Sequence, residues 1–185
     1  AIAREVGNRR SKGIVLSNLG GLHQGQGRMA EALMHCEQAL AIAREVGDRG
    51  FEGIVLGNLG DLLYTTGDLR AAEQQLQQAI EIGDEAWPVA AGAFRGTLAL
   101  IRAENGALAE ARALLEKGES QLRGVWSFEL AKLLCKRARV EQLAGDTAAA
   151  TAALSEAETI AEEVEAGPDS ELGKEISKAR AELAG

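Results

Sequence analysis

Apolar residues recur along the chain at helical spacing, in two stripes separated by a glycine. Leu56, Leu59 and Leu63 fall on one face of a helix that precedes Gly67. The stripe after this glycine consists of Leu69, Ala72, Leu76, Ala79 and Ile80. Glycine tolerates the left-handed conformation that ends a helix, so Gly67 marks a turn between two helices. The pattern therefore predicts an all-α chain built from helical hairpins.

The hairpin pattern repeats every 40 residues. Residues 1–40, laid over residues 41–80 without a gap, agree at 20 of 40 positions, and both copies begin with Ala-Ile-Ala-Arg-Glu-Val-Gly. Two weaker copies follow, in which a glycine and an alanine five residues later keep the spacing. The glycines are Gly27, Gly67, Gly106 and Gly145, and the alanines are Ala32, Ala72, Ala111 and Ala150. Such a period predicts stacked units that cannot bury their apolar faces alone.

Glycines and prolines place the ends of the predicted helices. Pro88 and Pro168 each stand where a helix should begin, the position at which proline costs least. We expect helices over residues 11–25, 28–46, 50–65, 68–83, 89–104, 107–122, 125–143, 146–165 and 169–183.

The repeat also predicts how the chain is divided. Residues 1–185 form a single array, in which residues 1–7 are the tail of a truncated preceding repeat. Four repeats then cover residues 8–47, 48–85, 86–123 and 124–166, and a capping helix covers residues 167–185. The stretch 155–185 holds nine acidic and three basic residues, which suits the polar outer face that a terminal unit needs.

Small residues recur at fixed places within the units. A Leu-Gly pair lies in the first helix of two units, at Leu19-Gly20 and Leu59-Gly60. A further alanine lies late in the second helix, at Ala39, Ala79 and Ala157. These positions resemble the tetratricopeptide repeat. Two units depart from its pattern, since Ala99 replaces the glycine in the third and Arg137-Ala138 replaces Leu-Gly in the fourth.

The 40-residue spacing, the Asn-Leu-Gly core and the opening Gly47-Asp48-Arg49 are similar to the extended repeats of kinesin light chains and Pins-type adaptors. Related arrays occur in bacterial signalling proteins. The resemblance implies a right-handed α-solenoid whose first helices line a concave groove and whose second helices form the back. It also implies a protein-interaction scaffold that binds a peptide or protein segment in that groove.

Helical spacing selects the residues of the first helices that face the groove. Positions −4, +3 and +7 relative to Asn58 lie on one helical stripe with it, and they are Ile54, Asp61 and Thr65. The equivalent residues in the preceding unit include Ile14 and Asn18. An asparagine amide offers a donor and an acceptor to an extended peptide backbone, so Asn18 and Asn58 are the first candidates for binding. The alternative is that each asparagine forms a hydrogen bond within its own hairpin. The full set of groove candidates is Ile14, Asn18, Gln24, Ile54, Asn58, Asp61, Tyr64, Thr65, Thr97, Lys132, Lys136 and Arg139.

Two features of this set bear on selectivity. Lys132, Lys136 and Arg139 lie at helical spacing and form a basic stripe, which could accept an acidic segment or could be a solvated face. Ile14 and Ile54 stand where the resembling Pins-type arrays often carry a basic residue. The N-terminal groove is therefore expected to be more apolar than in those adaptors.

Composition excludes several other classes of function. A net charge of −8 argues against a broad nucleic-acid-binding surface. Cys36 and Cys135 are far apart in the sequence, so we expect no disulfide. His23 and His35 lack a third ligand, so we expect no metal or cofactor. We expect His23 to pack at the hairpin interface. The segment 25–30 fits a dinucleotide-binding fingerprint but follows a helix, and no nucleophile has an acid-base partner. The chain is therefore not expected to be an enzyme.

The remaining expectations concern the setting of the chain. No apolar stretch approaches the length of a membrane span, which predicts a soluble, cytoplasmic protein without a membrane partner. The array is expected to be a regulatory or sensing part of a larger protein. The alternative is a self-associating structural array, in which Ile2 and Val6 at the exposed N-terminal edge contact another copy.

Overall fold

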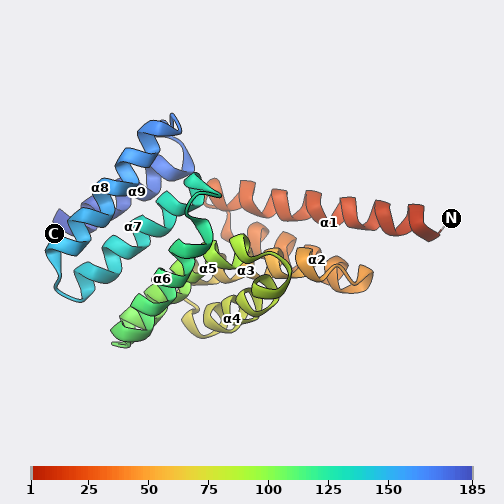
Figure 1. The fold of residues 1–185 in the computed structure, drawn as a ribbon. Helices are drawn as coiled ribbons and strands as arrows, with labels where there is room; N and C mark the ends of the chain where they lie inside the picture. Colours follow the sequence, from red (N-terminus) through yellow and green to blue (C-terminus); the bar gives the residue numbers. More distant parts are fainter. Residues whose placement is uncertain (1, 185) are drawn as a thin grey trace. The chain divides into compact units, whose positions relative to one another are not determined.

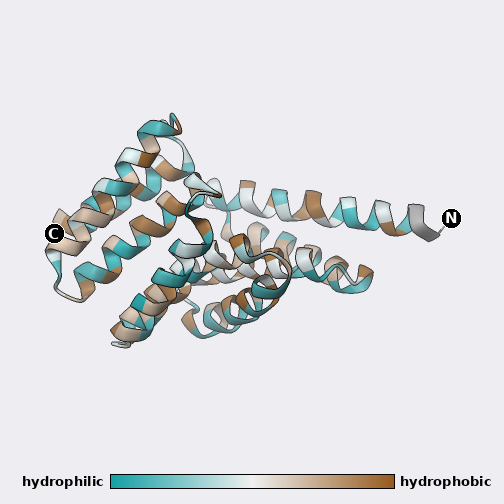
Figure 2. Ribbon diagram, in the orientation of Figure 1, coloured by the Kyte–Doolittle hydropathy of each residue, from teal (hydrophilic) through white to brown (hydrophobic). Residues whose placement is uncertain are grey.

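The computed structural model describes residues 2–184, and this part of the chain is entirely helical and loop (Figure 1). The helices are α1 (Ile2–Gly25), α2 (Met29–Val46), α3 (Arg49–Thr66), α4 (Leu69–Ala86), α5 (Pro88–Glu104), α6 (Leu108–Leu122), α7 (Ser127–Leu143), α8 (Thr147–Glu163) and α9 (Glu171–Ala184). The prediction of an all-α fold of antiparallel hairpins is confirmed. Along each helix, hydrophobic residues alternate with hydrophilic ones, as Figure 2 shows.

The helices form two compact units, Ala1–Trp87 and Pro88–Gly185. In the first unit α1 pairs with α2 and α3 pairs with α4, while α2 also packs on α3. In the second unit α5 pairs with α6 and α7 with α8, and both α5 and α6 pack on α7. The last helix, α9, packs on α7 and α8, as the first helix of a further hairpin would do.

The turns within the hairpins are built as the repeat predicts. Gly27, Gly67, Gly106 and Gly145 all have the left-handed backbone, with φ values of 75°, 87°, 81° and 75°. The alanines five residues later are fully buried, because the two helices of each hairpin approach closely at that point. Both features confirm the predicted period.

Aspartates start several of the helices. The carboxylates of Asp48, Asp68 and Asp146 each accept a hydrogen bond from a backbone N–H three residues further on, and so cap α3, α4 and α8. Pro88 is the first residue of α5. The limits of α2 to α9 consequently agree with the predicted limits to within about three residues.

The first helix differs from the prediction. We expected a helix from residue 11, with residues 1–7 as the tail of a preceding repeat, but α1 runs without a break from Ile2 to Gly25. Gly47, which is the equivalent of Gly7, ends α2 with a φ of 69°. Val6 is exposed on α1, and the side chain of Ile2 lies outside the described residues.

Glycines allow the close approach of the paired helices. A Cβ atom on Gly20 would lie 2.7 Å from Cys36 Sγ, and one on Gly60 would lie 2.6 Å from Leu76 Cγ. The third hairpin has Ala99 in place of this glycine and achieves the close approach elsewhere, between Gly92 and Gly118. A Cβ atom on Gly118 would lie 2.9 Å from the carbonyl oxygen of Gly92. The departures from the repeat pattern thus move the helix contact and preserve the hairpin.

Candidate functional site

A cleft in the N-terminal unit collects the two predicted asparagines. It encloses about 480 Å³. Helix α1 contributes Arg10, Ile14, Ser17 and Asn18 to its lining. The start and middle of α3 contribute Asp48, Gly50, Phe51, Ile54 and Asn58, and the end of α4 contributes Ala86 and Trp87. The cleft therefore lies between the first helices of two successive hairpins.

The asparagines differ in their surroundings. Asn58 is half-buried, and its Nδ2 donates to Ser17 Oγ at 3.4 Å, a long contact that joins α3 to α1. This contact links two hairpins, so the expected alternative of a hydrogen bond within one hairpin does not apply to it. Asn18 is exposed beside it, and within the described part of the chain no hydrogen bond engages its side chain.

One end of the cleft carries an ion pair. Arg10 Nε donates to Asp48 Oδ2 at 2.6 Å, while Asp48 Oδ1 accepts from Phe51 N at 3.0 Å. The hydrogen bond from the Phe51 N–H, together with the Arg10 guanidinium, lowers the pKa of the Asp48 carboxyl from its ordinary value. Asp48 is therefore an ionised carboxylate that fixes the start of α3 and the position of Arg10.

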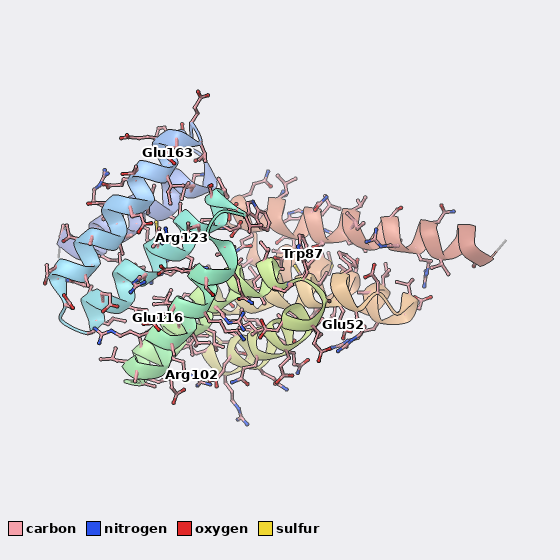
Figure 3. The ribbon with its side chains drawn as sticks, viewed as in Figure 1. Glu52, Trp87, Arg102, Glu116, Arg123 and Glu163 are labelled. Carbon is pink, nitrogen blue, oxygen red and sulfur yellow. The ribbon has the colours of Figure 1, made fainter. Side chains whose placement is uncertain are left out.

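Apolar side chains form the walls of the cleft. Ile14 and Ile54 are half-buried, and Phe51 is buried. Trp87 is 45% exposed at the end of α4 (Figure 3). An apolar surface beside amide groups suits the side chains and backbone of a peptide segment.

Seven lining residues of this cleft were not among the predicted candidates, namely Arg10, Ser17, Asp48, Gly50, Phe51, Ala86 and Trp87. Arg10 and Phe51 lie about one helical turn before Ile14 and Ile54, so the stripe could have been extended to them. Trp87 belongs to the chain between α4 and α5, which helical spacing on the first helices does not reach. The signal in the sequence is the Trp87-Pro88 pair. Pro88 starts α5, so Trp87 stands between two hairpins, at the end of the groove.

The other candidates on α1 and α3 lie outside this cleft. Gln24 and Tyr64 are half-buried farther along these helices. Thr65 is exposed, and its Oγ1 donates to the Asp61 carbonyl oxygen at 2.9 Å. Asp61 Oδ1 is buried without a hydrogen-bond partner.

The candidates of the C-terminal unit make contacts with neighbouring helices. Thr97 is buried, and its Oγ1 accepts from Lys136 Nζ at 2.7 Å. Lys132 Nζ lies 2.6 Å from Glu171, and Arg139 pairs with Glu182, so both cations meet carboxylates of α9.

These contacts change the picture of the basic stripe. The side chains of Lys132 and Arg139 are only 17% and 13% exposed, so the alternative of a solvated face is wrong for them. An acidic ligand at this stripe would compete with the carboxylates of α9.

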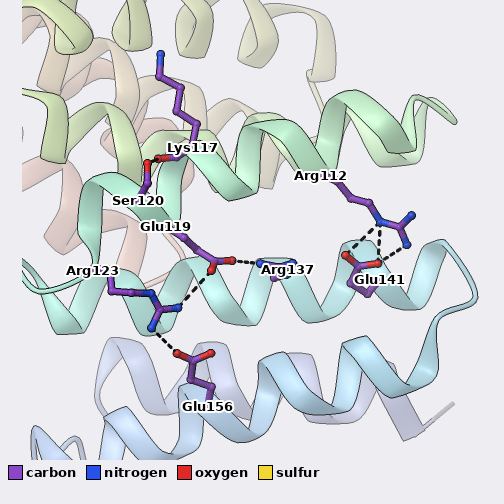
Figure 4. A network of polar contacts seen from close by, with 8 residues as sticks. All are labelled: Arg112, Lys117, Glu119, Ser120, Arg123, Arg137, Glu141 and Glu156. Atoms are coloured by element: carbon purple, nitrogen blue, oxygen red, sulfur yellow. Dashed lines mark hydrogen bonds and ion pairs between the residues drawn. The ribbon is translucent and has the colours of Figure 1, made fainter.

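Further ion pairs join successive helices of the second unit (Figure 4). Glu119 of α6 pairs with Arg137 of α7 and with Arg123, whose Nη1 also donates to Glu156 of α8 at 2.8 Å. Arg112 donates through Nε and Nη2 to the buried carboxylate of Glu141, at 3.0 and 2.6 Å to Oε2. The fixed geometry of these pairs indicates a structural role in joining the repeats.

A similar arrangement occurs in the first unit. Burial alone would raise the pKa of Glu52, but hydrogen bonds from Arg44 at 2.9 Å and from Arg49 at 2.6 Å outweigh it, and the pKa is lowered. Glu52 is thus an ionised carboxylate that connects the end of α2 to the start of α3.

The histidines and cysteines are part of the packing. His23 of α1 stacks on His35 of α2 with ring centroids 5.0 Å apart, which confirms the expected place of His23 at the hairpin interface. Burial raises the pKa of the Cys36 thiol, and it raises the pKa of Cys135 to about 12. Among the described residues, no group of three or more His, Cys, Asp or Glu side chains is arranged to hold a metal ion. No helix in residues 2–184 is long and apolar enough to cross a membrane.

The stacked hairpins and the cleft between their first helices define a helical-repeat protein of the α-solenoid class. Residues 12–85 match the sequence profile of the tetratricopeptide repeat. Over these residues the chain is thus similar to the tetratricopeptide repeat in sequence as well as in fold. Such repeats generally mediate protein–protein interaction, and proteins built from them are typically non-enzymatic scaffolds.

Solved structures share the fold. BtubC (BKLC) from P. vanneervenii is 19% identical with a TM-score of 0.65, and the match covers 84% of this chain but only 65% of that one. A kinesin light chain candidate from Podosopora anserina with nearly identical TPR-like repeats is 21% identical, with a TM-score of 0.57 and coverage of 85% and 78%. A variant of that Podosopora protein with one substitution is 19% identical, with a TM-score of 0.62 and coverage of 95% and 88%. No curated protein matches the sequence.

Proposed function

We propose that the cleft between α1 and α3 binds an extended peptide segment of a partner protein. The observation that carries this proposal is that Asn18 and Asn58, from equivalent positions of successive repeats, line the same cleft together with Ile14 and Ile54. The chain then acts as a non-enzymatic scaffold without a cofactor, as a regulatory or sensing part of a larger protein.

Chemistry of the cleft supports an extended ligand. A peptide backbone in this conformation has N–H and C=O groups without partners, and an asparagine amide can serve both. Successive side chains of an extended segment point in opposite directions, so alternate residues can lie on the apolar walls formed by Ile14, Ile54 and Phe51.

The charge of the cleft restricts which peptide segments can bind. Arg10 and Asp48 neutralise each other at one end of the cleft, and no lysine is among its described lining residues. The segment that fits is therefore apolar or uncharged where it meets the cleft. The overall charge of −8 disfavours nucleic acid as the partner.

Peptide selection tests the proposal. A displayed library of random dodecapeptides is selected on the intact chain, and the affinity of a selected peptide is measured by calorimetric titration. Asn18→Ala with Asn58→Ala should weaken binding about 10-fold or more, because each lost hydrogen bond is worth roughly 0.5–1.5 kcal/mol. The helical circular dichroism should stay unchanged.

The control replaces the same residue type outside the cleft. Asn8 and Asn105 are exposed, the first on α1 and the second after α5, and neither lines the cleft. Asn8→Ala with Asn105→Ala should leave the affinity unchanged. Equal affinity of the Asn18/Asn58 variant and the wild type would refute the proposed site.

An exposed apolar residue at the N-terminal end of α1 favours a second candidate function. Val6 is 42% exposed, and it would contact another copy of the chain in a self-associating array. Sedimentation equilibrium over a wide concentration range tests this candidate. A monomer mass that is independent of concentration would eliminate it.

A further inference from the structure

One face of α1, termed here the outer face, carries two apolar residues that the next repeat buries. Val15 is 57% exposed and Leu22 is 55% exposed. Their equivalents 40 residues later, Val55 and Leu62 of α3, are 0% and 1% exposed. The same residue types at the same register thus lie in solvent in one helix and in the core in the other.

The difference comes from the neighbours of the two helices. Each helix has its own hairpin partner, α2 for α1 and α4 for α3. Helix α3 has in addition the preceding hairpin, whose second helix α2 packs on it. By the repeat, the outer face of α1 corresponds to the part of α3 that the preceding hairpin covers.

Residues 1–7 provide a second observation. They are identical to residues 41–47, which form the end of α2, where Ile42 and Ala43 are buried and Gly47 turns the chain with a φ of 69°. In α1 residues 2–7 continue the helix, and a Cβ atom on Gly7 would meet no atom within 4 Å outside the backbone of its own helix. Residues 5–10 are all exposed.

We propose that the outer face of α1 docks the second helix of a further repeat hairpin, joined to α1 through residues 1–7. On docking, Gly7 adopts the left-handed backbone that Gly47 has, and Val15 and Leu22 become buried as Val55 and Leu62 are. This surface is separate from the cleft, so the inference does not rest on the proposed peptide binding.

Charge explains why the turn forms at Gly47 and the helix continues at Gly7. Across the turn at Gly47, Arg44 donates to the carboxylate of Glu52 at 2.9 Å. In the first repeat Lys12 stands where Glu52 stands, and Arg4 stands where Arg44 stands. The turned state therefore lacks this ion pair at Gly7 and brings two like charges together. Docking of the further hairpin must therefore supply the stabilising free energy that the missing ion pair does not provide.

An extended chain tests the inference directly. A copy of residues 8–47 is placed immediately before residue 8, and because residues 41–47 are identical to residues 1–7, the junction sequence is unchanged. The extended chain should unfold in one transition with a midpoint at least about 5 °C above that of the original chain.

Two sets of substitutions locate the effect. Val15→Gln with Leu22→Gln, made at the original α1, should lower the midpoint of the extended chain by about 5 °C or more, yet change that of the original chain by less than about 2 °C. Lys12→Glu at the same helix should raise the midpoint of the extended chain and not that of the original, because it restores the pair with the arginine of the added hairpin.

Several results would overturn the inference. They are an added hairpin that melts in a separate transition, an extended chain that fails to fold cooperatively, and an extended chain insensitive to the glutamine substitutions. A dimer of the original chain that these substitutions dissociate would assign the outer face to a second copy and would equally exclude the proposed occupant.

Discussion

Gly20 and Gly21 are neighbours in α1, but their surroundings are opposite. A Cβ atom on Gly20 would lie 2.7 Å from Cys36 Sγ and 3.4 Å from the carbonyl oxygen of Ala32, whereas one on Gly21 would meet no atom within 4 Å. Gly20 is therefore required by the contact with α2. Gly21 only weakens its helix, since glycine has a lower helix propensity than alanine.

This contrast predicts opposite effects of the same substitution. Gly20→Ala should lower the free energy of unfolding by about 1–2 kcal/mol, because overpacking costs about 1–3 kcal/mol and the gain in helix propensity offsets part of it. Gly21→Ala should raise the free energy of unfolding by up to about 1 kcal/mol. Urea denaturation of both variants measures these changes. Equal effects of the two substitutions would contradict the close approach of α1 and α2.

Single residues also show what the sequence could predict of the site. Helical spacing was sufficient to group Ile14, Asn18, Ile54 and Asn58, because all four lie on first helices in one register. It was not sufficient for the basic stripe on α7. The carboxylates that meet Lys132 and Arg139 come from α9, and contacts between distant segments are not visible in the spacing of one helix.

At the scale of the elements, most helix limits were predictable because the chain marks them locally. Glycines with positive φ end the first helices, while Asp48, Asp68, Asp146 and Pro88 start later ones. The start of α1 was not predictable from residues 1–7 alone. The same seven residues end a helix at Gly47, where Asp48 and Glu52 follow, and continue one at Gly7, where Asn8 and Lys12 follow.

The cap of α3 predicts a pH dependence of stability. Because the pKa of Asp48 is lower in the folded chain, this carboxyl binds fewer protons there than in the unfolded chain. Its stabilising contribution is complete above its ordinary pKa of 3.8 and disappears as the pH falls through the lower folded-state pKa. Asp48→Asn should therefore make the free energy of unfolding fall less steeply between about pH 5 and pH 2.

Arg10→Gln separates the two causes of this shift. The hydrogen bond from Phe51 N is the largest single cause, burial of the carboxyl opposes it, and Arg10 adds a hydrogen bond and a charge, so Arg10→Gln should reduce the wild-type pH dependence without abolishing it. Urea titrations at a series of pH values measure it. A variant at Arg10 that loses the pH dependence completely would show that the ion pair dominates over the cap.

At the scale of the whole molecule, each compact unit contains one buried cysteine, Cys36 in the first and Cys135 in the second. Burial raises the pKa of both thiols, so the reactive thiolate is suppressed wherever the fold is intact. The two thiols therefore report on the folding of the two units separately.

This placement predicts slow thiol modification of the folded chain. A pKa of about 12 in place of 9.0 leaves Cys135 with about 1,000-fold less thiolate near neutral pH. A disulfide reagent such as dithionitrobenzoate should react with neither thiol until the chain unfolds. Cys36→Ser and Cys135→Ser give the rate for each remaining thiol, and immediate reaction of either one in the native chain would contradict its burial.

The turn at Gly67 has a consequence for the chirality of the residue placed there. Its φ of 87° is accessible to a D-amino acid, and a Cβ built on the L-side would meet no atom within 4 Å, so conformation rather than space sets the preference. In a chain assembled by peptide ligation, D-alanine at this position should raise the free energy of unfolding by roughly 0.4–1 kcal/mol, because it restricts the unfolded chain. L-alanine should lower it by about 1–2 kcal/mol. A comparison of D-alanine with L-alanine thus distinguishes a glycine in a hairpin turn from a glycine inside a helix.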